Sequence, residues 1–270
     1  MNLTLESDSA RAYAVLAPAY DLLTAEYAYG PWLAAIEWLA VRHGLAGRRL
    51  LDVGCGTGKS FMPLLDRGFD VTACDISPEM VAEARHKAAG RAELHVADMR
   101  RLPVLGEFDL ITCLDDAINH LLGPDELADA FACLRANLAP GGLLVFDVNT
   151  LAAYSEIPDV VVEDDERLIR WRGKLAELTE PGEEAEVVID VFTHEGDGLW
   201  RRSLSRQRHR HHPVEEIREL AEEAGLEVAA VVGQRPGAVL DDELDERVHC
   251  KAVFVTRYER SSRWSGAPRV

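Results

Sequence analysis

The chain has 270 residues and is strongly acidic, with 47 aspartates and glutamates against 29 lysines and arginines and a net charge of −18. A chain of this length can bury a sizeable core, either as one large domain or as one domain with an insertion. The acidity disfavours nucleic acid as a partner, because phosphate contacts need a basic face. It suits a neutral or cationic small molecule.

No apolar run is long enough to span a bilayer, and residues 1–5 do not begin a signal peptide, so we expect no membrane partner. The five cysteines are odd in number and lack paired spacing, which fits a reducing compartment. We therefore expect a cytoplasmic protein, and a homodimer stays open.

The first part of the chain has apolar residues at helical spacing. It runs from Ser9 to Glu26, and Pro18 interrupts it, which predicts two short helices or a kink. A second helix is expected from Trp32 to His43.

Strands and helices then alternate. Apolar runs predict strands at 49–53, 69–74, 92–96, 108–113 and 142–147. Helical spacing predicts helices at 59–67, 78–89 and 125–137. This alternation implies a parallel sheet covered by helices on both faces.

The pattern changes after Thr150. Strands without intervening helices are predicted at 168–172, 186–192 and 199–204, which indicates an antiparallel sheet. A helix at 214–224 and strands at 227–232 and 248–257 follow. The polar tail from Ser261 is expected to be disordered.

An acid and three glycines at alternating positions follow the first core strand: Asp52, Gly54, Gly56 and Gly58. Such a turn holds nucleotide-like cofactors in α/β folds. A dinucleotide fingerprint needs its third glycine one residue later, and a P-loop ending in Lys59 needs a glycine where Val53 stands. The D/E-x-G-x-G-x-G loop of class I S-adenosylmethionine (SAM)-dependent methyltransferases matches at every position.

Two further strands end in an acid. Asp75 could accept both hydroxyls of a ribose, a role that fits NAD and SAM equally. Asp98 could accept from an adenine amino group, with the apolar Met99 beside it under the ring. Three strand-end acids in order form a stronger signal for SAM than the glycine loop alone.

These motifs resemble class I SAM-dependent methyltransferases over most of the chain, from about Leu50 to Tyr258. Segment 75–80 resembles the family's second motif, 108–113 its fourth strand, and 138–144 its L-x-P-G-G-x-L turn. The resemblance implies an α/β fold with a Rossmann-like seven-stranded sheet whose last strand is antiparallel. It also implies four regions: an N-terminal helical lid (1–45), a SAM-binding core (46–150 and 211–260), an inserted antiparallel β cap (151–210) and a tail (261–270).

The resemblance implies that SAM is the cofactor and assigns it residues. Ile76 would pack on the adenine, Leu114 and Asp115 would contact the methionine part, and Tyr20 of the lid would lie near its carboxylate. Tyr13 is expected to pack in the core. The expected cofactor residues are Tyr20, Asp52, Gly54, Cys55, Gly56, Gly58, Asp75, Ile76, Met80, Asp98, Met99, Leu114 and Asp115.

Three residues are candidates for chemistry at the acceptor. His120 could be a base, since imidazole titrates near neutrality, or it could cap or pack at the next helix. Asp147 could pair with the acceptor or make a structural hydrogen bond. His211 lies in the run 209–212, for which we expect a place in the acceptor pocket and no metal, because no cysteine or acid stands at ligand spacing.

Many small-molecule methyltransferases of antibiotic and amino-sugar pathways carry such a cap. The resemblance therefore implies methyl transfer to N or O of a small molecule, in secondary metabolism. Three alternatives stay open: a tRNA or protein methyltransferase, a P-loop NTPase, and a SAM-binding protein of the same fold with other chemistry.

Overall fold

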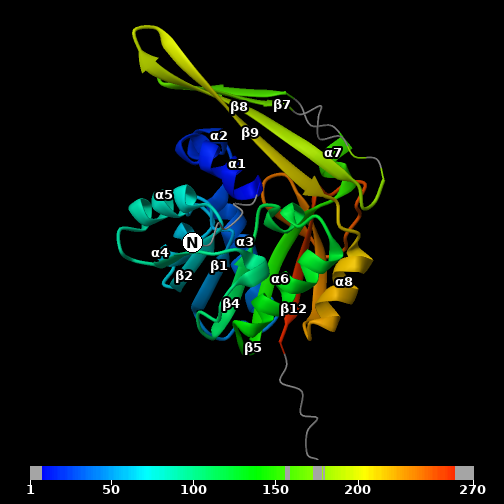
Figure 1. Ribbon diagram of the computed structural model, residues 1–270. Helices are drawn as coiled ribbons and strands as arrows, with labels where there is room; N and C mark the ends of the chain where they lie inside the picture. Colours follow the sequence, from blue (N-terminus) through cyan, green and yellow to red (C-terminus); the bar gives the residue numbers. More distant parts are fainter. Residues whose placement is uncertain (1–7, 156–158, 173–177, 179, 259–270) are drawn as a thin grey trace, which may run out of the picture.

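A computed structural model describes residues 8–155, 159–172, 178 and 180–258 (Figure 1). Its centre is an eight-stranded sheet with the strand order β11-β10-β12-β5-β4-β1-β2-β3. The strands are β1 (Arg49–Val53), β2 (Asp70–Asp75), β3 (Glu93–Val96), β4 (Phe108–Cys113), β5 (Leu138–Asn149), β10 (Glu227–Arg235), β11 (Val239–Asp241) and β12 (Lys251–Arg257).

Strands β1 to β5 pair in parallel, and β12 lies antiparallel to both β5 and β10. The predicted α/β fold with an antiparallel last strand is confirmed. The sheet has one strand more than the seven predicted, because β11 extends its edge by pairing with β10. Three residues are too few to give a periodic signal in the sequence.

Helices cover both faces of this sheet (Figure 1). They are α3 (Tyr29–Arg42), α4 (Met62–Asp66), α5 (Pro78–Ala88), α6 (Pro124–Ala136) and α8 (Val214–Glu223), with short turns at η2 (Met99–Arg101), η3 (Ala117–His120) and α7 (Leu151–Ser155). Helix α5 begins at Ser77, whose side chain accepts a hydrogen bond from the Met80 backbone. It ends at Ala89 in the left-handed conformation.

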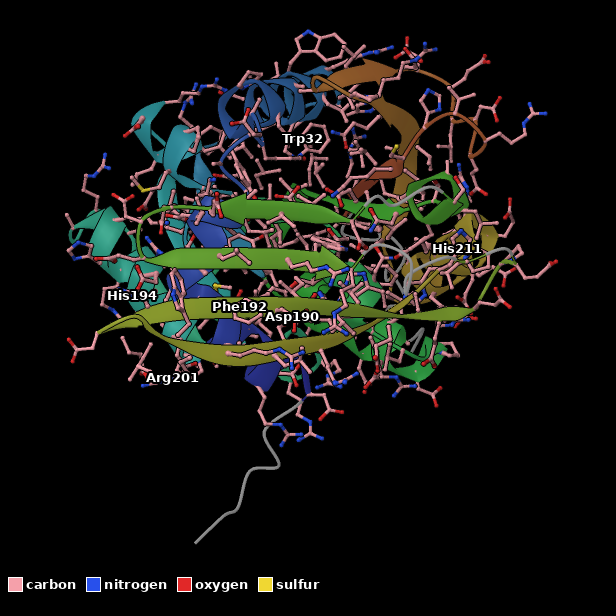
Figure 2. The ribbon with its side chains drawn as sticks, turned by 90° about the horizontal axis from the view of Figure 1, so that it is seen from above. Trp32, Asp190, Phe192, His194, Arg201 and His211 are labelled. Atoms are coloured by element: carbon pink, nitrogen blue, oxygen red, sulfur yellow. The ribbon has the colours of Figure 1, made fainter. Side chains whose placement is uncertain are left out.

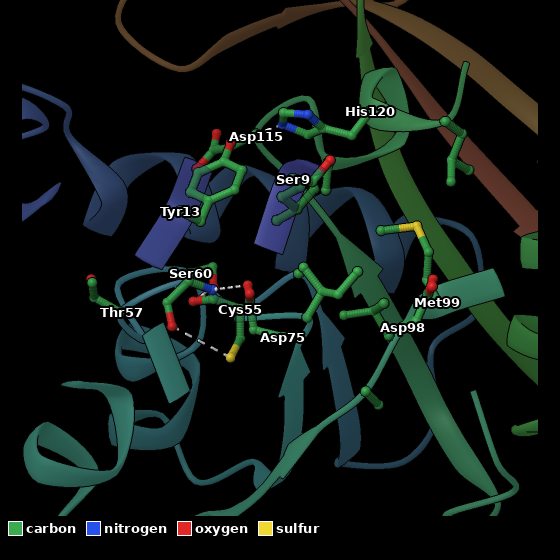
Figure 3. A pocket seen from close by; sticks show the side chains of 18 of the residues that line it. Ser9, Tyr13, Cys55, Thr57, Ser60, Asp75, Asp98, Met99, Asp115 and His120 are labelled. Carbon is green, nitrogen blue, oxygen red and sulfur yellow. Dashed lines mark hydrogen bonds between the residues drawn. The ribbon is translucent and has the colours of Figure 1, made fainter. Parts of the chain in front are cut away.

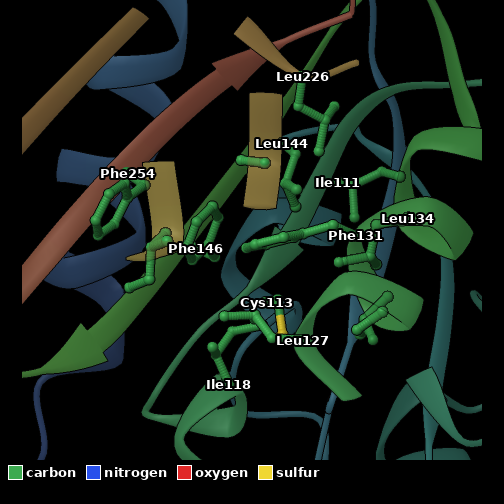
Figure 4. Packing of buried hydrophobic residues seen from close by; sticks show 14 of the residues in the cluster. Ile111, Cys113, Ile118, Leu127, Phe131, Leu134, Leu144, Phe146, Leu226 and Phe254 are labelled. Atoms are coloured by element: carbon green, nitrogen blue, oxygen red, sulfur yellow. The ribbon is translucent and has the colours of Figure 1, made fainter. Parts of the chain in front are cut away.

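The core has two halves, one on each face of the sheet. Successive residues of β4 show the division: Leu110 packs with Ile36 of α3, and Ile111 packs in the cluster that contains Phe131 of α6. In that second cluster, shown in Figure 4, Phe146 stacks on Phe254 with ring centroids 4.9 Å apart. Strands buried on both faces read as continuous apolar runs, which is why the sequence predicts them well.

A second sheet of four antiparallel strands, which we call the cap, has the order β6-β7-β8-β9. Its strands are β6 (Val160–Glu163), β7 (Arg167–Arg172), β8 (Glu184–Gly196) and β9 (Leu199–Arg210). Seen from the cap side in Figure 2, β8 and β9 cross over the molecule, with His194 toward one end and His211 toward the other. Strand β6 was not predicted from the sequence, and β8 and β9 are longer than predicted.

Three short helical segments lie between the cap and the large sheet: α1 (Asp8–Leu16), η1 (Ala17–Ala19) and α2 (Tyr20–Leu23). We call these segments the lid. Leu16 and Ala17 of the lid pack with Ile189 of the cap in one apolar cluster. Helix α3, which the prediction included in the lid region 1–45, instead buries Trp32 against the large sheet.

The exact domain boundaries stay a prediction. The tail 261–270 lies outside the described residues. None of the helices in the described part of the chain is long and apolar enough to cross a membrane.

Candidate active site

A cavity of about 500 Å³ opens at the carboxyl ends of β1, β2 and β4, next to the lid (Figure 3). This is where open α/β sheets bind ligands, because the loops after neighbouring strands diverge there. Most of the expected cofactor residues line it: Tyr20, Gly54, Cys55, Gly56, Asp75, Ile76, Asp98, Met99, Leu114 and Asp115.

The glycine loop is held against β2 by its backbone. The N–H groups of Gly54 and Cys55 donate to the Cys74 carbonyl at 2.9 and 3.0 Å. Gly54 has φ of 74°, and a Cβ at this position would come within 3.0 Å of the Ala117 side chain. Glycine is therefore needed for both the backbone conformation and the space. Gly58 does not line the cavity; its Cβ would meet Phe61 at 3.1 Å.

The Asp75 carboxylate is fixed at the cavity wall by two backbone donors. Its Oδ2 accepts from Gly56 N and its Oδ1 from Ser77 N, both at 2.9 Å. Burial raises the pKa of Asp75, and these backbone N–H groups oppose the rise. A carboxylate has about four acceptor positions, so two remain for a ligand's hydroxyl groups.

Asp98 is partly engaged by a neighbour that the sequence did not single out. The Arg100 guanidinium donates to both of its carboxylate oxygens, at 2.7 to 3.1 Å, and also pairs with Glu126 of α6. Partial burial alone would raise the pKa of Asp98, but the bonds from Arg100 outweigh it and lower the pKa. Asp98 therefore stays ionised as an acceptor beside Met99.

Tyr13 and His120 meet at the cavity wall, one from the lid and one from η3. The Tyr13 hydroxyl lies 2.8 Å from His120 Nε2, and Figure 3 shows the two side chains pointing toward each other. Burial and the neighbouring His209 lower the pKa of His120 to about 3, so its imidazole is neutral at neutral pH. Tyr13 packs against the apolar cluster between lid and cap, as predicted, and it also lines the cavity.

The comparisons with known proteins identify the type of protein. Residues 50–142 match a methyltransferase domain family. A SAM-dependent methyltransferase from Clostridium acetobutylicum superimposes with a TM-score of 0.75 at 24% identity, over 92% of this chain and 99% of its own. The chain therefore contains a methyltransferase domain and has the fold of SAM-dependent methyltransferases.

Other proteins similar to this chain differ in what their names say they act on. A sugar N-methyltransferase from Streptoalloteichus sp. superimposes with a TM-score of 0.73 at 23% identity, over 90% of this chain and 93% of its own. A Geobacillus protein provisionally named a methyltransferase is 28% identical over 88% of this chain and 96% of its own length. A cypemycin N-terminal methyltransferase from Streptomyces is 28% identical over 81% of this chain and 88% of its own.

Two residues expected at the cofactor are placed behind the cavity wall. Asp52 of β1 is fully buried and accepts hydrogen bonds from the Ser60 and Thr112 hydroxyls, at 2.5 and 2.6 Å. Burial raises the pKa of Asp52 to about 7. Met80 packs in the apolar cluster between lid and cap. Neither side chain lines the cavity, although Asp52 holds Ser60, which does.

Asp147, proposed from the sequence for acceptor chemistry, supports the loop after β4. It is fully buried, and its carboxylate accepts from the backbone N–H groups of Asp115 and Asp116 at 2.9 and 2.8 Å. Both of those residues have positive φ, 57° and 56°, so the loop needs such support. Lys251 of β12, which the sequence analysis missed, lies 3.0 Å from Asp147. These contacts match the alternative prediction for Asp147, a structural hydrogen bond, and not the pairing with the acceptor.

His211 is also outside the cavity. Strand β9 ends at Arg210, so the alternation that would have put His209 and His211 on one face stops there. His211 is buried and its Nδ1 accepts from Gly182 N at 3.3 Å. It is His209 that reaches the site, with its ring centroid 4.4 Å from that of His120. An acceptor-pocket role for His211 finds no support in this placement.

Lys59, the residue that made a P-loop worth considering, is engaged with the lid. Its Nζ donates to the carbonyl and hydroxyl oxygens of Thr24 at 2.7 and 2.9 Å. The Thr57 hydroxyl likewise donates to Asp21 of α2 at 2.6 Å. These bonds tie the lid end to the glycine loop, and those to Thr24 occupy two of the three N–H donors of the lysine ammonium.

Proposed function

We propose that this methyltransferase transfers the SAM methyl group to nitrogen or oxygen of a small molecule in secondary metabolism, with an amine as the better supported acceptor. The observation that carries this proposal is the Tyr13–His120 pair at the cavity wall, between the glycine loop and the cap. It gives the cavity a polar end beyond the expected cofactor residues.

The residues present fit SAM. Bound SAM supplies a methyl group already activated by its sulfonium, so the protein's task is alignment and exclusion of water. Asp75 is placed to hold ribose hydroxyls, and Asp98 with Met99 to hold the adenine. Asp115 and Tyr20 of the lid also line the cavity.

The electrostatics favour an amine over a hydroxyl. A hydroxyl acceptor benefits from a base that can store its proton, and a useful base has a pKa near the working pH. The pKa of His120 is lowered to about 3, so the imidazole is a weak base there. A neutral amine attacks without prior deprotonation. His120 then acts as a positioning residue that orients the Tyr13 hydroxyl toward the acceptor.

The comparisons support a small acceptor. A sugar N-methyltransferase shares the fold over 90% of this chain. A dTDP-3-amino-3,6-dideoxy-alpha-D-glucopyranose N,N-dimethyltransferase from Streptomyces fradiae is 35% identical, over 42% of this chain and 44% of its own length. The net charge of −18 disfavours a tRNA substrate.

A panel of acceptors tests the proposal. The enzyme is incubated with SAM and amino sugars, simple amines, phenols, bulk tRNA or peptides, and S-adenosylhomocysteine and methylated product are measured by mass spectrometry. We expect turnover with an amine-bearing small molecule, reduced in Tyr13→Phe and unchanged in the exposed cap control His194→Gln. Turnover with tRNA or peptides alone would overturn the small-molecule proposal, and turnover with phenols alone would overturn the amine preference.

A further inference from the structure

Two histidines and a carboxylate meet beside the cavity. His120 of η3 and His209 of β9 have ring centroids 4.4 Å apart and ring planes at 81°. Asp116, just before η3, has a carboxylate oxygen 3.6 Å from His209 Nδ1. One potential ligand atom from each of the three residues lies within 4.8 Å of the other two. The loop before η3, η3 itself and the cap thus bring nitrogen and oxygen donors to one point.

His120 and His209 have buried ring nitrogens that lack hydrogen-bond partners among the described residues. His120 Nδ1 and both ring nitrogens of His209 are buried without a hydrogen bond among the residues that the structure describes. The His209 side chain is only 3% exposed, and the Asp116 oxygen at 3.6 Å is beyond hydrogen-bond distance. Buried polar groups nearly always have a partner. Nitrogens of this kind point to a ligand that completes the cluster.

We propose that Asp116, His120 and His209 bind a divalent first-row transition metal ion, such as Zn²⁺ or Co²⁺, beside the acceptor end of the cavity. Two imidazoles and one carboxylate are donors that these ions accept, and three protein ligands leave a position for water or an acceptor atom. Mg²⁺ and Ca²⁺ prefer sites made of oxygen alone. Burial lowers the pKa of His209 to about 4, so both imidazoles are in the neutral form that binds metal.

The surroundings suit a cation with this ligand set. A metal-binding histidine usually donates its second ring N–H to a fixed partner, and the Tyr13 hydroxyl at 2.8 Å from His120 Nε2 can accept it. Lys251 lies 3.7 Å from Asp116, which by itself would repel an ion. The same ammonium also neighbours Asp115 and Asp147, so three carboxylates against one ammonium leave two negative charges. That excess favours a dication.

The test uses the full-length, tag-free protein after treatment with a chelator, in the absence of SAM. Co²⁺ is titrated while its visible absorption is followed, and Zn²⁺ by calorimetry, with excess Mg²⁺ to occupy exposed carboxylates. We expect one ion per chain and Co²⁺ bands typical of nitrogen ligation. His209→Gln and Asp116→Asn should each weaken binding at least about tenfold, since even outer partners of metal ligands contribute 10- to 100-fold.

The control is His211→Gln, which removes another buried histidine of the same run but not from the cluster; it should bind the ion as the parent does. Circular dichroism establishes that each variant is folded, and Asp116→Asn, a change in a loop, serves if His209→Gln does not fold. Absence of saturable one-to-one binding, or equal affinity in parent and cluster variants, would overturn the proposal. Because the readout is metal binding alone, its outcome is separate from that of the methyl-transfer assay.

Discussion

The contribution of Asp75 to cofactor binding can be predicted from its hydrogen bonds. Each carboxylate oxygen already accepts one backbone N–H, from Gly56 and Ser77, which aims the remaining lone pairs into the cavity. Hydrogen bonds to a charged group contribute about 1.5–3 kcal/mol each. Asp75→Asn removes the charge and turns one acceptor into a donor. We expect a loss of about 2–4 kcal/mol of SAM binding, roughly 30- to 1,000-fold in Kd.

The measurement is isothermal titration calorimetry with SAM and with S-adenosylhomocysteine, which share the ribose. Asp70→Asn is the matched control, because Asp70 is exposed at the opposite end of the same strand. A thermal melt of each variant establishes that the protein is folded at the titration temperature. If folded Asp75→Asn binds SAM as tightly as the control, the ribose role of Asp75 is refuted.

Three further predictions test the site, the core and the pH dependence. His120→Asn should lower kcat/KM by less than roughly 100-fold, the smallest loss expected when a general base is removed, and should leave the shape of the pH–rate profile unchanged. If the variant instead loses a pH-dependent part of the profile near neutrality, His120 is a base. Phe146→Ala should cost about 3–5 kcal/mol in urea unfolding, because it empties the stack on Phe254, and a cost below 1 kcal/mol would contradict this packing. The folded-state pKa of Asp52 is raised to about 7, so its contribution to stability is present below its ordinary pKa near 3.8 and is lost as pH rises through 7. The difference in unfolding free energy between the parent and Asp52→Asn should therefore fall from pH 4 to pH 8. A difference that does not change with pH would refute the raised pKa of Asp52.

The large sheet could be predicted because its strands are buried on both faces. The apolar runs of β1 and β4 gave their bounds without error, since most of the buried positions in these strands are hydrophobic. The cap was harder. The inward positions in the second half of β9 are Ser205, Gln207 and His209, which are buried but polar, so no apolar alternation marks them. The predicted strand at 199–204 therefore stops where the apolar signal stops.

The site was predictable as far as it depends on local sequence. Asp75, Asp98 and the glycine loop follow strands directly, and parallel strands bring their carboxyl ends to one edge. Partners from distant elements were not predictable: Lys251 reaches Asp147 from β12, and Glu126 of α6 pairs with the Arg100 guanidinium that holds Asp98. That Tyr13 also lines the cavity was not predictable either, because helical spacing cannot tell a core face from a face that closes a cavity.

Competition between cofactors is the decisive measurement, because it shows directly what the glycine loop binds. Calorimetry of the full chain should show SAM and S-adenosylhomocysteine binding at one site per chain, with neither displaced by ATP. We expect that result if the Asp75 carboxylate, which lines the cavity, accepts from the ribose hydroxyls of SAM. Tight ATP binding without SAM binding would contradict the account.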